Sequence, residues 1–334
     1  MRLAQAELRR LFLRRFTRWM LLIAVLVLSG VAVTAAVSST PNTPQTQAAA
    51  QVQAEQQARE MAEQHRRDVA ECEAARARGE DVTQSWPPDC DIYDYSGEVQ
   101  ASWFLPYEFV FRQEFGSYLA VFFGVLTLVA FLVGASFVGA EWSSGAMTNL
   151  LLWQPRRLRV LFTKLGVLLA AMTTLTLASG ALWTAGFWLV GRFGGRLGEL
   201  TPGAWRSFGL DGLRGLTFLL LVTVASFAIA SIGRHTAAAL GAVVGLGMIS
   251  EVGVRILVES LETPFGERYV LSSYLLAWVQ KSYTIVDYFG CPDGAACPER
   301  TLVLTWHDSL LVLGVGAGLT VLAAALSMRR RDVA

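Results

Sequence analysis

The sequence predicts an all-α membrane protein with six transmembrane helices. Of the 334 residues, 53% are hydrophobic and only 16% are charged, a balance too apolar for a soluble globular protein. Six apolar segments are long enough to cross a bilayer, whose hydrocarbon core requires about 20 helical residues. Arginine and lysine gather in the segments that join these spans on one side, and short basic segments resist translocation. The chain is therefore expected to be a multi-pass protein of fixed orientation.

The six expected spans cover residues 19–37, 117–140, 161–190, 211–232, 236–258 and 306–328. The side that holds both termini is expected to carry half of the 28 Arg and Lys residues. It is expected to carry only three of the 27 acids, namely Glu7, Glu141 and Asp332. This asymmetry predicts that both termini are cytoplasmic, although the outer link between the third and fourth spans carries three arginines against the rule.

Residues 1–18 are basic and predict an amphipathic helix at the cytoplasmic membrane face. Leu8, Phe12 and Phe16 fall at helical spacing and leave a polar face that includes Arg9, Arg10 and Arg14. The same arginines would equally serve as a topology signal for the first span. That span, 19–37, is expected to be an uncleaved anchor; a cleavable signal peptide ending near 34–36 is the alternative.

The long outer region, 38–116, is expected to be a helical cap. Its part 45–78 is rich in Gln, Ala, Glu and Arg, which predicts a solvated helix of about 50 Å. A turn-rich acidic stretch and a belt of aromatic residues then lead back to the membrane. A structural cap is favoured over a ligand-binding site.

All four cysteines fall in the two large outer regions, as expected in an oxidising compartment. Four cysteines allow three pairings. We predict Cys72–Cys90 and Cys291–Cys297, because each pair shares one loop. Zinc binding is the alternative, but the spacing is not C-x₂-C and no histidine flanks the pairs.

The loop between the second and third spans, 141–160, is expected to be a cytoplasmic coupling loop. It is basic, with Glu141 as its single acid. Ser143 or Ser144 is expected to cap a short helix that Pro155 ends. The apolar side chains of this helix are Met147, Leu150, Leu151 and Trp153. A short amphipathic helix between two spans is well placed to transmit a movement of a soluble partner to the membrane-spanning helices.

Residues 236–305 contain two further features. Glu251, Arg255 and Glu259 are spaced by four residues on one face of the fifth span. Ionisable groups at this depth are costly in free energy, so they indicate a substrate pathway or an interface (seam) between subunits. The alternative is that the three side chains form ion pairs with one another along the helix. The outer region 259–305 includes the apolar stretch 269–283, which is too short to cross and predicts a re-entrant or interfacial helix.

Several motifs are absent. Neither of the two lysines follows a glycine in a phosphate-binding loop, and no zinc-protease or serine-hydrolase signature occurs. We therefore predict no catalytic site, no metal and no cofactor on this chain. The net charge of +1 predicts no nucleic-acid partner.

The chain resembles the permease subunit of ABC-2 type ABC transporters in their six-span bacterial form. The resemblance rests on the basic lead 7–19, the loop GAEWSSGAMTNLLLWQPRRLRVLFTK from Gly139, the re-entrant stretch and the basic ending from Met328. It implies a bacterial plasma-membrane protein, surrounded by lipid, that pairs with a second permease chain, identical or homologous. It also implies separate ATPase subunits that bind ATP and magnesium, and the export of a lipophilic, drug-like, peptide or glycolipid substrate.

The resemblance assigns Glu141, Gly145, Leu150, Leu151, Pro155, Arg157 and Lys164 to the motif of the coupling loop. The predicted ATPase-coupling set also includes Met147, Arg156, Arg9, Arg10 and Arg14. Two other functions remain open. One is a membrane sensor or scaffold whose disulfide-stapled outer loop binds a ligand, and the other is an intramembrane enzyme that uses Glu251 and Glu259.

Overall fold

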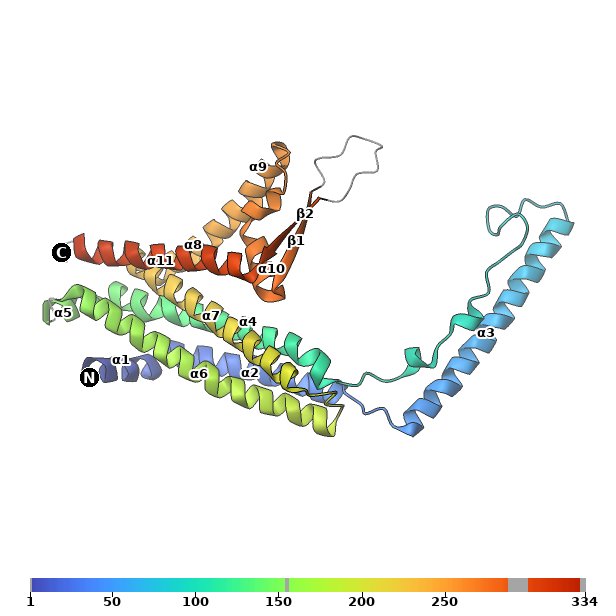
Figure 1. The fold of residues 1–334 in the computed structure, drawn as a ribbon, viewed down its shortest axis with the longest axis horizontal. Helices are drawn as coiled ribbons and strands as arrows, with labels where there is room; N and C mark the ends of the chain where they lie inside the picture. Colours follow the sequence, from blue (N-terminus) through green and yellow to red (C-terminus); the bar gives the residue numbers. More distant parts are fainter. Residues whose placement is uncertain (1, 154–155, 288–299, 331–334) are drawn as a thin grey trace. The chain divides into compact units, whose positions relative to one another are not determined.

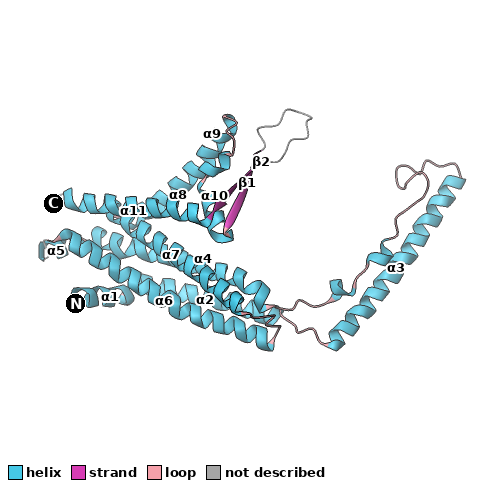
Figure 2. Ribbon diagram, in the orientation of Figure 1, coloured by secondary structure: helices cyan, strands magenta, loops and turns pink. Residues whose placement is uncertain are grey.

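The computed structural model describes residues 2–153, 156–287 and 300–330. The chain divides into two compact units (Figure 1). The first unit is formed by residues 1–30, 115–185 and 200–334, and the second by 31–114 and 186–199. Helices dominate both units, as Figure 2 shows.

Six helical stretches are long and apolar enough to cross a membrane, which confirms the predicted architecture. They are α2 (Arg15–Ser38), α4 (Phe111–Ser143), α6 (Arg157–Phe193), α7 (Pro202–Gly233), the stretch Thr236–Ser260 and α11 (Trp306–Arg330). The helix α1 (Arg2–Leu13) precedes them as expected. At 1.5 Å per residue, the 37 residues of α6 extend over about 55 Å, so this helix is longer than a hydrocarbon core of about 30 Å.

Small residues let α4 approach its neighbours closely in the first unit. A Cβ atom on Gly134 would lie 2.5 Å from the Ser226 hydroxyl of α7. A Cβ atom on Gly139 would lie 2.5 Å from the backbone nitrogen of Thr236. Close backbone approach at glycine is a common way to pack helices without a hydrophobic driving force. The helix α7 also packs against α8 (Thr236–Met248) and α11.

The fifth span contains a π-helical turn. After α8 it passes through a π-helical turn, η3 (Ile249–Val254), and ends in α9 (Arg255–Ser260). A 3₁₀ turn, η4 (Gly266–Tyr269), then leads into α10 (Leu271–Gln280). The ten residues of α10 are too few to cross a membrane, as predicted for this stretch.

A two-stranded antiparallel sheet, which the sequence analysis did not predict, covers α10. Its strands are β1 (Ser282–Asp287) and β2 (Arg300–Thr305), with Ser282 opposite Thr305 and Asp287 opposite Arg300. The sheet packs on α10 through a buried cluster of Ala277, Ile285 and Leu304.

The second unit contains the predicted solvated helix, α3 (Pro44–Ala77). Thr43 begins α3 with a reciprocal pair of hydrogen bonds to Thr46. Two 3₁₀ turns, η1 (Tyr95–Glu98) and η2 (Ala101–Phe104), pack against α3.

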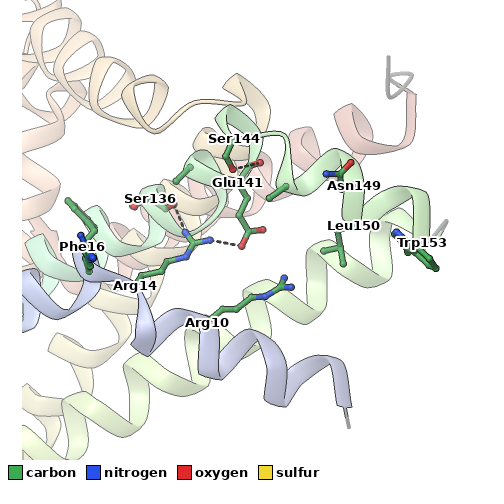
Figure 3. A pocket seen from close by; sticks show the side chains of 12 residues that line it. Arg10, Arg14, Phe16, Ser136, Glu141, Ser144, Asn149, Leu150 and Trp153 are labelled. Carbon is green, nitrogen blue, oxygen red and sulfur yellow. Dashed lines mark hydrogen bonds and ion pairs between the residues drawn. The ribbon is translucent and has the colours of Figure 1, made fainter.

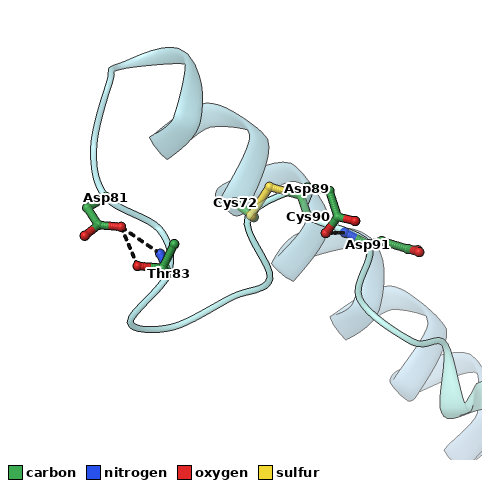
Figure 4. The surroundings of a disulfide bond; sticks show 6 residues. All are labelled: Cys72, Asp81, Thr83, Asp89, Cys90 and Asp91. Carbon is green, nitrogen blue, oxygen red and sulfur yellow. Dashed lines mark hydrogen bonds between the residues drawn. A yellow bond between two sulfur atoms is a disulfide. The ribbon is translucent and has the colours of Figure 1, made fainter.

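The disulfide Cys72–Cys90 joins the loop that follows α3 back to this helix (Figure 4). The bond confirms the predicted pairing, and it is buried with Ala75 and Val82. Cys291 and Cys297 lie outside the described residues.

Candidate coupling site

The segment 141–164, here called the elbow, joins α4 to α6 through a short helix where the sequence predicts one. The helix α4 ends at Ser143, α5 covers Ala146–Trp153, and α6 begins at Arg157. Gly145 lies between α4 and α5 with φ of +73°, a left-handed conformation that only glycine adopts without cost. The turn at Gly145 therefore fixes the direction in which α5 leaves α4.

The expected serine cap of α5 is wrong. The Ser144 hydroxyl donates to the Glu141 carbonyl at 3.4 Å, and the Ser143 hydroxyl donates to the Ala140 carbonyl at 3.2 Å. Both serines thus bond to the last turn of α4, a local alternative that serine hydroxyls often take. Gly145 supplies the turn instead.

The two faces of α5 differ sharply in exposure. Met147 and Leu151 are buried, so they hold α5 against the rest of the first unit. The side chains of Leu152 and Trp153 are 74% and 87% exposed. The predicted coupling residues did not include Leu152 or Trp153, although the sequence places Trp153 among the apolar side chains of this helix. A signal was present, because AMTNLLLW has more apolar residues than one face of an eight-residue helix can bury.

Two of the predicted residues, Glu141 and Lys164, lie inside the protein as members of a buried ion-pair cluster. The Lys164 ammonium lies 2.5 Å from a carboxylate oxygen of Glu7 and 2.7 Å from one of Glu141. The Arg14 guanidinium lies 2.5 Å from the other oxygen of Glu141. The side chains of Lys164 and Glu7 are both only 1% exposed. We call Glu7, Arg14, Glu141 and Lys164 the ion-pair cluster.

The ion-pair cluster is closely packed and electrically neutral. Arg14 also donates to the carbonyls of Ser136 and Phe137, both at 3.1 Å. The cations of Arg14 and Lys164 lie 5.2 and 5.1 Å from the centre of the Phe137 ring, within cation–π range. Two acids and two bases balance, as burial of charge requires.

The ion-pair cluster ties three elements together. Glu7 belongs to α1, Glu141 to α4 and Lys164 to α6, while Arg14 is the single residue between α1 and α2. These residues are distant in sequence, so their pairing was not predicted. The cluster holds the amphipathic helix α1 on the elbow.

An open groove of about 750 Å³ lies beside the elbow (Figure 3). Arg10, Arg14 and Arg15 line one side, and Asn149, Leu150 and Trp153 of α5 line the other. Glu141 is the only acid in the lining and pairs there with Arg14, so Arg15 and Arg10, which is half exposed beside Glu7, are the remaining cations of the groove. The groove is therefore basic, with apolar side chains on its α5 wall.

The remaining predicted coupling residues lie at or near the same end of the first unit. Arg9 and Arg156 are exposed, and Arg157 is partly buried at the start of α6. Pro155 lies outside the described residues.

The predicted seam residues occupy a different environment, at the π-turn of the fifth span. A carboxylate oxygen of Glu251 accepts from the Ser272 amide at 2.9 Å, and the Ser250 hydroxyl accepts from the Leu271 amide at 2.7 Å. Both therefore satisfy orphan amides at the start of α10. Arg255 pairs with Glu251 at 3.6 Å, and Glu259 is exposed. A pathway or seam role for these residues stays a prediction.

A family model described as ABC-2 family transporter protein matches residues 1–333. Comparisons with curated proteins and with solved structures found no match.

Proposed function

Because the chain belongs to the ABC-2 transporter family, a family of membrane transport components, we propose that it is the permease of an exporter powered by ATPase subunits on separate chains. Its six membrane-spanning stretches fit this role. ATP and magnesium would be bound by the ATPases, and this chain would supply the path through the plasma membrane. The proposed cargo is lipophilic, and a second permease chain would complete the path.

The observation that carries the proposal is the exposed apolar tip of α5 beside a basic groove. Leu152 and Trp153 leave large apolar surfaces uncovered at the end of α5, whose buried side chains are Met147 and Leu151. Tryptophan is among the residues that most often dominate binding at protein interfaces. The adjoining groove supplies arginines that would pair with acidic side chains of the ATPase. We place this end of the chain in the cytoplasm, because both termini and the elbow are basic.

The proposed mechanism follows from how the elbow is held. A partner shifts a two-state equilibrium only by the difference between its contact energies with the two states. Those contacts would be made at Leu152 and Trp153. Since the ion-pair cluster fastens α1, α4 and α6 to one another, a displacement of α5 moves the ends of two spans together.

Replacing Trp153 by aspartate tests the proposal. Trp153→Asp and Leu152→Asp are each introduced into the full chain, and binding of a candidate ATPase is measured with the permease in nanodiscs. We expect a loss of about 2 kcal/mol, or roughly 30-fold in Kd, for Trp153→Asp. The matched control is Ser143→Asp, which adds the same charge at the exposed end of α4. Unchanged binding in both α5 variants would count against an ATPase at this site.

The same experiment separates the exporter from the sensor or scaffold. A sensor would bind a ligand at the loop closed by Cys72–Cys90 and would move no cargo across the membrane. An ATPase that binds through α5 and drives transport is expected only of the exporter.

A further inference from the structure

A cavity of about 310 Å³ lies within the first unit, between α4, α7 and α10. Its volume is at the lower end of the range for small-molecule sites, about 300–1,000 Å³, so it suits one slender molecule. Its lining includes Phe123, Thr127, Arg214, Phe218, Trp278 and Lys281. None of these residues belongs to the coupling site.

The walls of the cavity are apolar and aromatic. Trp278 of α10 is buried, and its ring lies 6.1 Å from that of Phe218 on α7. On α4, a Cβ atom at Gly124 would meet no atom within 4 Å, so the space in front of this glycine is open. An apolar chain would fill the space through van der Waals contacts with the aromatic rings.

The mouth of the cavity carries a surplus of positive charge. Arg214 lies 2.5 Å from a carboxylate oxygen of Asp211, and Lys281 lies 3.3 Å from the same oxygen. One carboxylate thus faces two cations, which leaves one net positive charge. The backbone of Lys281 has φ of +75°, a conformation that is costly for a residue with a side chain and that often marks functional sites.

The charged mouth lies at one end of the apolar part of α7. Asp211 is the first residue of the apolar run that the sequence predicts to cross the bilayer, so the cations lie where lipid headgroups meet hydrocarbon. The contacts Phe115–Phe208 and Gly134–Ser226 show that α4 and α7 run in the same direction. The cavity therefore extends from a cationic mouth into the depth of the membrane.

We propose that this cavity binds an acidic single-chain amphiphile taken from the bilayer. Its anionic headgroup would lie between Arg214 and Lys281, and its chain would extend along Phe123, Phe218 and Trp278. When no amphiphile is bound, Arg214 and Lys281 both remain paired with Asp211. That this amphiphile is the exported cargo rests on the proposed function; that it binds does not.

The test uses the full chain in phosphatidylcholine nanodiscs, without an ATPase. The probes are a photoactivatable palmitic acid and the alcohol of the same chain length, and the yield of crosslinks to α4 and α10 is measured against probe concentration. We expect Arg214→Gln and Lys281→Gln each to weaken capture of the acid about ten-fold or more. Capture of the alcohol should not change. Each variant leaves Asp211 with one cation, so the fold is retained.

A second pair of variants tests the cavity itself. Gly124→Leu fills the open space and should abolish saturable capture of the acid. Gly166→Leu is the matched control, because Gly166 lies on α6 outside the lining and its Cβ would also meet nothing. Equal capture of acid and alcohol, or no effect of Gly124→Leu, would overturn the proposal. Displacement of the probe by phosphatidylglycerol but not by free palmitic acid would assign the cavity to a two-chain lipid and would also overturn it.

An ATPase that docks normally on a chain that fails to bind the acid would refute this inference alone. Acid binding by a chain on which no ATPase docks would refute the proposed function alone.

Discussion

Replacing Lys164 by methionine should destabilise the first unit strongly, because Lys164 is the cation shared by two buried carboxylates. Its ammonium lies 2.5 Å from Glu7 and 2.7 Å from Glu141. After the change, Glu141 keeps Arg14, but Glu7 keeps only the half-exposed Arg10 at 3.3 Å. Breaking a buried pair by removing one partner costs about 3–5 kcal/mol, since the remaining charge is left uncompensated.

The change Glu7→Leu should cost less, about 1–3 kcal/mol, because Lys164 still contacts Glu141. The double variant Glu7→Leu with Lys164→Met leaves the pair Arg14–Glu141 and restores neutrality. We therefore expect the double variant to be more stable than Lys164→Met alone, with an interaction energy of about 1–3 kcal/mol between the two sites.

Equilibrium unfolding of the purified chain in mixed micelles, followed by circular dichroism, measures these differences. Lys281→Met is the matched control, because this lysine is half exposed and its pair with Asp211 is longer, at 3.3 Å. An exposed pair of this kind contributes only about 0–1 kcal/mol. A cost of Lys164→Met no larger than that of Lys281→Met, or a double variant whose cost is the sum of the single costs, would refute the reasoning.

Three further predictions concern other parts of the chain. Ser250→Ala removes an acceptor at the start of α10, so the first amide of α10 should exchange hydrogen roughly five-fold faster, for a loss of about 1 kcal/mol; unchanged exchange would show that the hydroxyl is dispensable. Reduction of the disulfide Cys72–Cys90, whose cysteines are 18 residues apart, should lower the stability of the folded loop by about 3 kcal/mol and speed its cleavage by trypsin. The same cleavage rate with and without reductant would contradict this. The side-chain and backbone hydrogen bonds that Asp81 accepts from Thr83 hold the pKa of Asp81 below its usual range (Figure 4). The pKa of Asp81 is lower in the folded chain than in the unfolded chain. These bonds therefore stabilise the turn fully above the ordinary aspartate pKa, and their contribution is lost as the pH falls through the folded pKa of Asp81. An NMR titration of the Thr83 amide with a midpoint at or above that of a free aspartate would contradict this.

The sequence predicts those features of this chain that depend on local composition. The long apolar runs become spanning helices, because a helix satisfies its own backbone groups wherever it lies in the bilayer. The solvated α3 also begins where its Thr-Pro signal lies, and Cys72 and Cys90 pair within one loop. Proline and glycine likewise mark the elbow, whose turn at Gly145 requires a left-handed backbone.

The sequence alone does not show which residues from distant parts of the chain a side chain contacts in the fold. Met147 and Leu151 face the protein while Leu152 and Trp153 face away, because helical spacing alone does not say which apolar face is covered. The pairing of Glu7 with Lys164 joins residues 157 positions apart. A hint was present, since Glu7 is a lone acid in a basic lead, and charges near hydrocarbon seek a partner.

Two departures near the fifth span have their own causes. Ser250 and Glu251 lie in the π-turn, and both accept from amides at the start of α10, while Glu251 also makes the expected pair with Arg255. The sheet of β1 and β2 had a readable signal in the β-branched runs SYTIVD and RTLVLT, but a short alternation of this kind is easily taken for part of a helical region.

The helix α4 contributes to both the candidate coupling site and the proposed amphiphile cavity, so it would link the two mechanically. It runs without a break from Phe111 to Ser143 and lines the cavity from Gly116 to Thr127. Only ten residues later, about 15 Å along the helix, its Phe137 backbone accepts from Arg14 of the ion-pair cluster. Gly134 lets α4 pack tightly against α7. A displacement of the elbow therefore cannot slide α4 along α7 without breaking this contact. A partner that moves α5 would therefore move α4 and α7 as a pair relative to α10, the third wall of the cavity, and the affinity for an acidic occupant would change with it.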